Sequence, residues 1–126
     1  MVILGVAVAT RIVAWWNPVA DVDGEFYLLV GRGMLEGHWP YVDIWDRKPL
    51  GLFLLYAGLA WVGGGNIFGV NIVATLCTIG TAWLIRSIGM RFTSAKGATL
   101  AALIYLFYLP LYGGQTGQTA VFYNLL

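Results

Sequence analysis

The ionisable residues of this chain are confined to one stretch, and this confinement is the strongest constraint on its fold. All six acidic residues and the single histidine lie between residues 21 and 48, together with three of the seven basic residues. The segments on both sides are nearly all apolar and carry the other four bases. Long apolar segments around one polar loop are typical of a membrane protein with a functional loop outside the bilayer.

The composition agrees with a membrane location. Of the 126 residues, 60% are hydrophobic and only 10% are charged, which is too apolar for an ordinary soluble domain. The bases are few and scattered, so a nucleic-acid partner is not expected. Cys77 stands alone, so the sequence predicts neither a disulfide framework nor a cysteine-based metal site.

Three apolar segments are predicted to cross the membrane as helices, at about residues 2–16, 67–85 and 97–112. The first contains Arg11 and is slightly shorter than the roughly 20 residues of a usual span. A signal peptide is the competing interpretation of this segment. The sequence therefore predicts an all-α, polytopic transmembrane helical bundle.

The loop between the first two spans, residues 17–65, is expected to contain two helices on the membrane surface. Asp23 is well placed to cap the first helix, which should run over about residues 24–36 and stop at Gly37. Its apolar residues recur with helical spacing. The second helix, at about residues 49–62, is too short to span. The ordered, irregular loop between them is expected to fold back towards the start of the first helix.

The positive-inside rule gives the bundle a direction. Arg86, Arg91 and Lys96 lie in the short connection between the second and third spans, and basic connections face the cytoplasm. Residues 17–65 therefore belong on the outer side of the cell membrane. If residues 49–62 crossed the membrane instead, the basic connection would face outward, against the rule.

Two motifs in the loop resemble the first outer loop of the GT-C glycosyltransferases. They read D-x-E-x-Y-x-x-x-x-R-x-M-L-x-G from Asp23 and P-Y-x-D-x-W-D-x-K-P-L from Pro40. The pattern is similar to that of protein O-mannosyltransferases, lipid A aminoarabinose transferases and bacterial transferases of the RgtA/B/C/D-like domain type. The resemblance implies a polytopic enzyme with two juxtamembrane helices in this loop and a polyprenyl-phosphate sugar as donor.

The resemblance also assigns roles position by position. Asp23 matches the catalytic acidic residue at the start of the first juxtamembrane helix, and Lys48 with Pro49 matches the Lys-Pro pair. Gly24 stands where many relatives have a second acidic residue, which weakens the case for a metal site; Leu50 replaces the second proline of the usual Lys-Pro-Pro. No metal ligand is predicted, and a divalent metal is left open as a cofactor.

The chemistry gives these residues a physical reason. Transfer of a sugar from a lipid phosphate to a hydroxyl needs a base for the hydroxyl proton and positive charge for the departing phosphate. Asp23 is the candidate base, and Lys48 with Arg47 is the candidate phosphate-binding pair. The remaining candidates for substrate binding are Glu25, Tyr27 and Asp43.

Each candidate also has a purely structural interpretation. Asp23 is a common helix-capping residue, and Lys48 and Arg47 could extend to lipid headgroups or balance the acids of the loop. Asp43 and Asp46 are expected to order the loop rather than to react.

The expected partners are the sugar donor, membrane lipids and an acceptor that is a glycan, a lipid or a protein. The competing class is non-enzymatic: a small membrane subunit or lipid-binding protein whose acidic loop docks a partner. Residues 120–126 resemble the start of a further helix. We therefore expect the chain to be the N-terminal part of a longer enzyme and to be inactive by itself.

Overall fold

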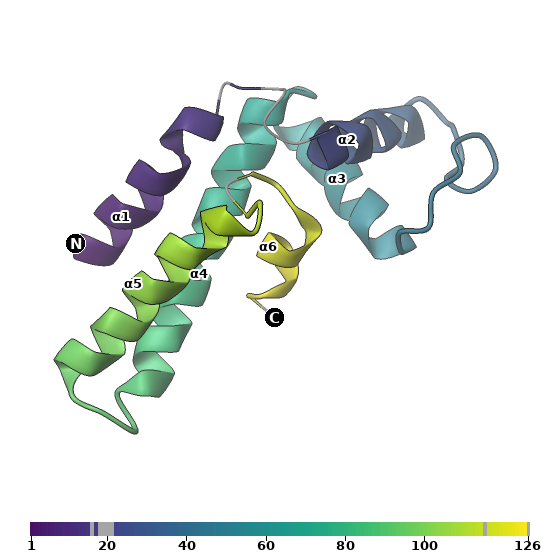
Figure 1. Ribbon diagram of the computed structural model, residues 1–126. Helices are drawn as coiled ribbons and strands as arrows, with labels where there is room; N and C mark the ends of the chain where they lie inside the picture. Colours follow the sequence, from purple (N-terminus) through teal and green to yellow (C-terminus); the bar gives the residue numbers. More distant parts are fainter. Residues whose placement is uncertain (16, 18–21, 115, 126) are drawn as a thin grey trace.

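The computed structural model describes residues 1–15, 17, 22–114 and 116–125. In this part of the chain every regular element is helical (Figure 1), so the predicted all-α class is confirmed. Residue 16, the last residue of the first predicted span, lies outside the described residues. The elements are α1 (Val2–Arg11), the 3₁₀ turn η1 (Ile12–Ala14), α2 (Val22–Leu35), α3 (Leu50–Val62), α4 (Ile67–Gly89), α5 (Ala95–Leu111) and α6 (Thr119–Tyr123).

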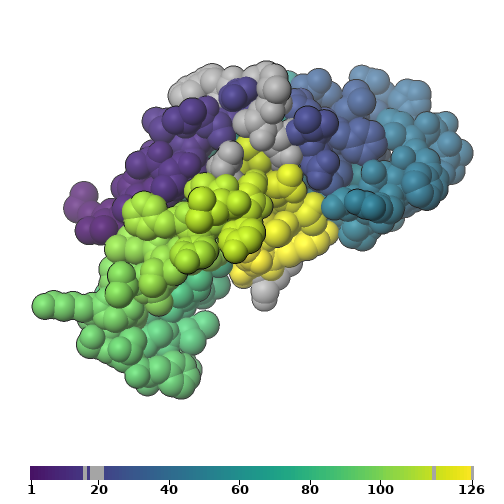
Figure 2. Space-filling view, in the orientation of Figure 1, coloured from purple at the N-terminus to yellow at the C-terminus, as the bar shows by residue number. Residues whose placement is uncertain are grey.

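Helices α1, α4 and α5 pack side by side as a bundle (Figure 1). Small side chains let these helices approach closely: Ala7, Ala82 and Ala102 are fully buried between them. Helices α2 and α3 form a second unit beside the start of α4, and α6 lies between this unit and α5 (Figures 1 and 2).

Besides its apolar core, the bundle buries several polar side chains and exposes large apolar ones. Arg11 is only 1% exposed; its Nε donates to Thr75 Oγ1 at 3.2 Å, and its terminal nitrogens donate to the carbonyl oxygens of Gly114 and Thr116. Other polar side chains buried along α4 are Asn71, Thr75, Thr78 and Thr81. Large apolar residues of α4 and α5 are instead exposed: Leu76, Trp83, Leu84, Ile88, Leu100, Ile104, Phe107 and Leu111.

Only α4, with 23 residues, is long and apolar enough among the described helices to cross a membrane on its own. The other apolar helices expected to span, α1 with η1 and α5, have fewer than 18 residues. At 1.5 Å per residue, such helices are shorter than the roughly 30 Å of a bilayer core. By length and composition, α4 could cross a membrane, and the three-span arrangement remains a prediction.

Helix α2 begins two residues earlier than expected. Asp23 therefore lies in the first turn and not before the helix, so its interpretation as the N-cap is wrong. A carboxylate in the first turn still interacts favourably with the helix dipole. The other end follows the prediction: Gly37 has φ +96°, its N–H donates to Met34 O, and the N–H of His38 donates to Gly33 O. This pair of bonds is a Schellman motif, which ends the helix.

Candidate active site

The loop after α2 returns to the first half of the same helix, as the sequence predicted. The Nζ atom of Lys48, at the end of the loop, lies 5.7 Å from the centroid of the Tyr27 ring. This distance is within the range of a cation–π interaction. Two residues that are 21 positions apart in the motif are therefore brought together by the fold.

The Tyr27 ring is held by α3 and is itself 2% exposed. It packs against Phe53 and Tyr56, with ring centroids 6.3 Å and 5.5 Å away. Helices α2 and α3 approach this closely because Gly31 has no side chain: a Cβ there would lie 2.7 Å from backbone atoms of Tyr56 and Ala57. Tyr27 is therefore a buried support beneath Lys48, and its burial argues against the predicted contact with a substrate.

The backbone of Lys48 is fixed by side chains of its own loop. The Lys48 N–H donates to Asp46 Oδ1 at 2.8 Å, and its carbonyl oxygen accepts from the Tyr41 hydroxyl at 2.6 Å. The Tyr41 ring packs on Phe53, with centroids 5.8 Å apart. Because both polar groups of the Lys48 peptide are engaged, the direction in which the side chain leaves the loop is set.

The turn at the tip of the loop is ordered by Asp43. Its Oδ2 accepts from the backbone N–H of Trp39 at 2.7 Å and lies 3.9 Å from His38 Nδ1. Tyr41 adopts a left-handed conformation with φ +71°, which is uncommon for a residue other than glycine. The expectation that Asp43 and Asp46 order the loop is therefore confirmed, and a substrate contact of Asp43 stays a prediction.

Helical geometry separates the two acidic candidates. Asp23 is exposed and lies four residues before Tyr27, so both side chains lie on the same side of α2. Glu25 lies two residues before Tyr27, about 200° around the helix. Since Lys48 contacts the Tyr27 ring, the carboxylate placed on the Lys48 side is that of Asp23.

The three basic residues of α2 and the loop have different surroundings. The ammonium of Lys48 makes no ion pair with any residue that the structure describes, so its charge is available to an anion. Arg47 is exposed and its side chain has no hydrogen-bond or ionic partner in the described part of the chain. Arg32 instead lies against the glycine turn before α4: a Cβ at Gly65 would lie 3.0 Å from Arg32 Nε. Arg32 therefore contacts the turn between α3 and α4.

Two supporting residues were missed from the sequence. Tyr41 was read only as part of a motif, although its hydroxyl holds the Lys48 carbonyl. Gly31 was read as an unspecified motif position, although it sets the approach of α2 and α3. A glycine inside an otherwise regular helical pattern was the available signal for Gly31, because such a glycine often marks a close helix contact.

No group of three potential metal-ligating His, Cys, Asp or Glu side chains is found among the described residues. Comparisons of the chain with protein-family models, with curated proteins and with solved structures gave no match.

Proposed function

We propose that this protein is a multi-pass membrane glycosyltransferase that moves a sugar from a polyprenyl-phosphate donor to an acceptor hydroxyl on the outer face of the membrane. The observation that carries the proposal is the position of Lys48. Its ammonium lies over the Tyr27 ring and has no carboxylate partner among the described residues. Asp23 lies one helical turn before Tyr27 on α2. A cation and a carboxylate on one side of α2 are the two groups that this transfer requires.

The side-chain distribution in the bundle supports the membrane part of the proposal. In water, a surface with the exposed apolar side chains of α4 and α5 would be an aggregation liability. In lipid, apolar side chains belong outside, whereas polar side chains such as Asn71 and Thr75 hydrogen-bond within the bundle. The three-span topology then places α2, α3 and the loop on the outer side.

The proposed reaction uses the two charged groups in sequence. Asp23 removes the proton from the acceptor hydroxyl, and the hydroxyl oxygen attacks the anomeric carbon of the donor sugar. The bond from that carbon to the phosphate oxygen breaks, and the electron pair leaves with the phosphate. Lys48 stabilises the negative charge on the departing polyprenyl phosphate. The products are the glycosylated acceptor and polyprenyl phosphate, with one proton on Asp23.

A binding experiment tests the role of Lys48. The purified protein is titrated with polyprenyl monophosphate and, separately, with the uncharged polyprenol. Lys48→Ala should weaken binding of the phosphate about tenfold, since a hydrogen bond to a charged group is lost, and should leave binding of the alcohol unchanged. Arg91→Ala, which removes a cation at the other end of the bundle, is the matched control. Equal phosphate affinity in the Lys48→Ala variant and the wild type would remove Lys48 from the site.

A further inference from the structure

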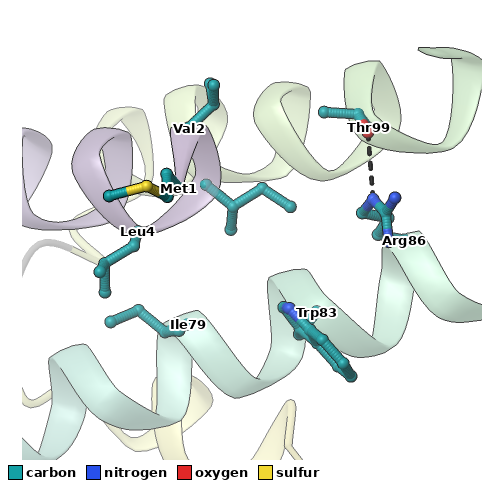
Figure 3. Close-up of a pocket in the computed structure, with 8 residues that line it drawn as sticks. Met1, Val2, Leu4, Ile79, Trp83, Arg86 and Thr99 are labelled. Atoms are coloured by element: carbon teal, nitrogen blue, oxygen red, sulfur yellow. Dashed lines mark hydrogen bonds between the residues drawn. The ribbon is translucent and has the colours of Figure 1, made fainter. Parts of the chain in front are cut away.

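A pocket of about 590 Å³ lies between the start of α1 and the helices α4 and α5 (Figure 3), at the end of the bundle away from α2 and α3 (Figure 1). Its volume is within the range of small-molecule sites in proteins. The start of α1 contributes apolar side chains, and α4 and α5 contribute the other walls. Its lining residues are Met1, Val2, Ile3, Leu4, Ile79, Trp83, Arg86 and Thr99.

Arg86 is the one charged side chain in this lining. Its Nε donates to Thr99 Oγ1 at 3.1 Å, which orients the guanidinium towards α5 (Figure 3). The two terminal nitrogens donate to no residue in the part of the chain that the structure describes. Every acid of the sequence lies before residue 47, and none of the described acids forms an ion pair with Arg86. The guanidinium therefore offers its outer donors to an anion that the described chain does not supply.

A second hollow, of about 460 Å³, meets the first at Arg86 and Thr99. It adds a second cation, Lys96, and apolar side chains from α5, Leu100 and Leu103. Arg86 thus lies between two adjoining hollows with apolar walls, and Lys96 lines one of them. A pair of cations beside two open, largely apolar hollows is complementary to a molecule with an anionic head and a hydrocarbon chain.

We infer that this end of the bundle binds one anionic phospholipid. The phosphate of its headgroup accepts hydrogen bonds from Arg86 and Lys96, and an acyl chain occupies the pocket between Val2, Leu4 and Ile79. Arg86, Arg91 and Lys96 are the bases that the positive-inside rule assigns to the cytoplasmic side, where the leaflet carries anionic lipids. The inference rests on the membrane location in the proposed function and is independent of glycosyl transfer.

Photolabelling in vesicles tests this site. The protein is reconstituted in phosphatidylcholine with a small fraction of a probe lipid that carries a diazirine in its acyl chain. The probe has either a phosphatidylglycerol or a phosphatidylcholine headgroup. Peptide mass mapping should find adducts of the anionic probe on residues 1–4 and 79–83, about fivefold or more above those of the choline probe. One basic residue near a membrane surface changes anionic lipid binding by about that factor.

The variants separate the headgroup contact from general labelling. Arg86→Gln and Lys96→Gln should each lower the anionic preference by about fivefold, while the choline probe keeps its yield. Arg91→Gln removes a base from the same connection that lines neither hollow, and it should keep the wild-type preference. Equal labelling by both probes in the wild type, or an unchanged preference in Arg86→Gln, would overturn the inference. If neither probe labelled α4 or α5 anywhere, the result would contradict both the lipid site and the membrane location.

Discussion

The ammonium of Lys48 lies over the ring of Tyr27, 5.7 Å from its centroid. This contact joins the end of the irregular loop to the first half of α2 and brings the two loop motifs together. Within the loop, the hydrogen bonds of the Lys48 backbone with Asp46 and Tyr41 keep Lys48 in this position. The position of Lys48 in the candidate site therefore depends on the ordered loop as well as on the packing of α2 against α3.

Gly31→Ala should destabilise the α2–α3 unit. The added methyl would lie 2.7 Å from the backbone of Tyr56 and Ala57, so the helices must separate. We expect a loss of about 1–3 kcal/mol in the free energy of unfolding, the usual cost of overpacking. The matched control is Gly58→Ala in α3, where a Cβ meets nothing within 4 Å; it should be neutral or stabilising. Denaturant titration of both variants in detergent measures the difference, and equal stability would contradict the close approach.

Tyr41→Phe should loosen Lys48 without disturbing the core. The variant keeps the ring on Phe53 and loses the hydroxyl that donates to the Lys48 carbonyl. We expect a loss of roughly 1 kcal/mol in stability, the usual contribution of one hydrogen bond. Because the loop then holds Lys48 less firmly, we expect about a fivefold weaker affinity for polyprenyl monophosphate. Tyr112→Phe, at an exposed position beyond α5, is the control. Wild-type affinity in Tyr41→Phe would show that the hydroxyl does not position Lys48.

The three-span topology predicts the sides of the membrane on which three exposed residues lie. Single cysteines at positions 42 and 112 should react with a membrane-impermeant thiol reagent added from outside, and a cysteine at position 90 should not. The native residues Val42, Tyr112 and Met90 are 81%, 82% and 49% exposed, so access is limited by the bilayer and not by packing. Cys77→Ala supplies the cysteine-free background. Labelling of position 90 from outside would show that the basic connection faces outward, which requires α3 to cross the membrane.

Much of the helical layout could be predicted from the sequence because it depends on local signals. Apolar periodicity and glycine punctuation located the helices within a few residues, and Gly37 ended α2 as expected. The start of α2 was wrong by two residues, since an Asp serves equally well before a helix or in its first turn.

The long-range contacts could not be predicted in the same way. The sequence shows Arg11 only as a charge within the first apolar segment. In the structure it is buried against Thr75 and two carbonyl oxygens more than 100 residues along the chain. The cation–π contact of Lys48 depends on the left-handed Tyr41 and on Gly31, and no short motif specifies either relationship.

The role of Asp23 is the central claim, and substitution at the chromosomal gene tests it in the protein as the cell makes it. Asp23→Asn keeps a polar residue in the first turn of α2 but cannot accept the acceptor proton, so transfer should slow by about a hundredfold or more. Glu25→Gln, on the other side of the helix, is the matched control. Mass spectrometry of lipid extracts reports the pool of polyprenyl-phosphate sugars, and immunoblotting confirms equal protein levels.

This lipid measurement works for any sugar and any acceptor, because it follows the donor pool as a whole. We predict that one polyprenyl-phosphate sugar accumulates in the Asp23→Asn strain, because its consumption is blocked, and that the Glu25→Gln strain matches the wild type. Accumulation in the Glu25→Gln strain alone would indicate that Glu25, on the other side of α2, is the base. An unchanged lipid pool in both strains, at equal protein levels, would contradict the account and favour a docking role for the loop.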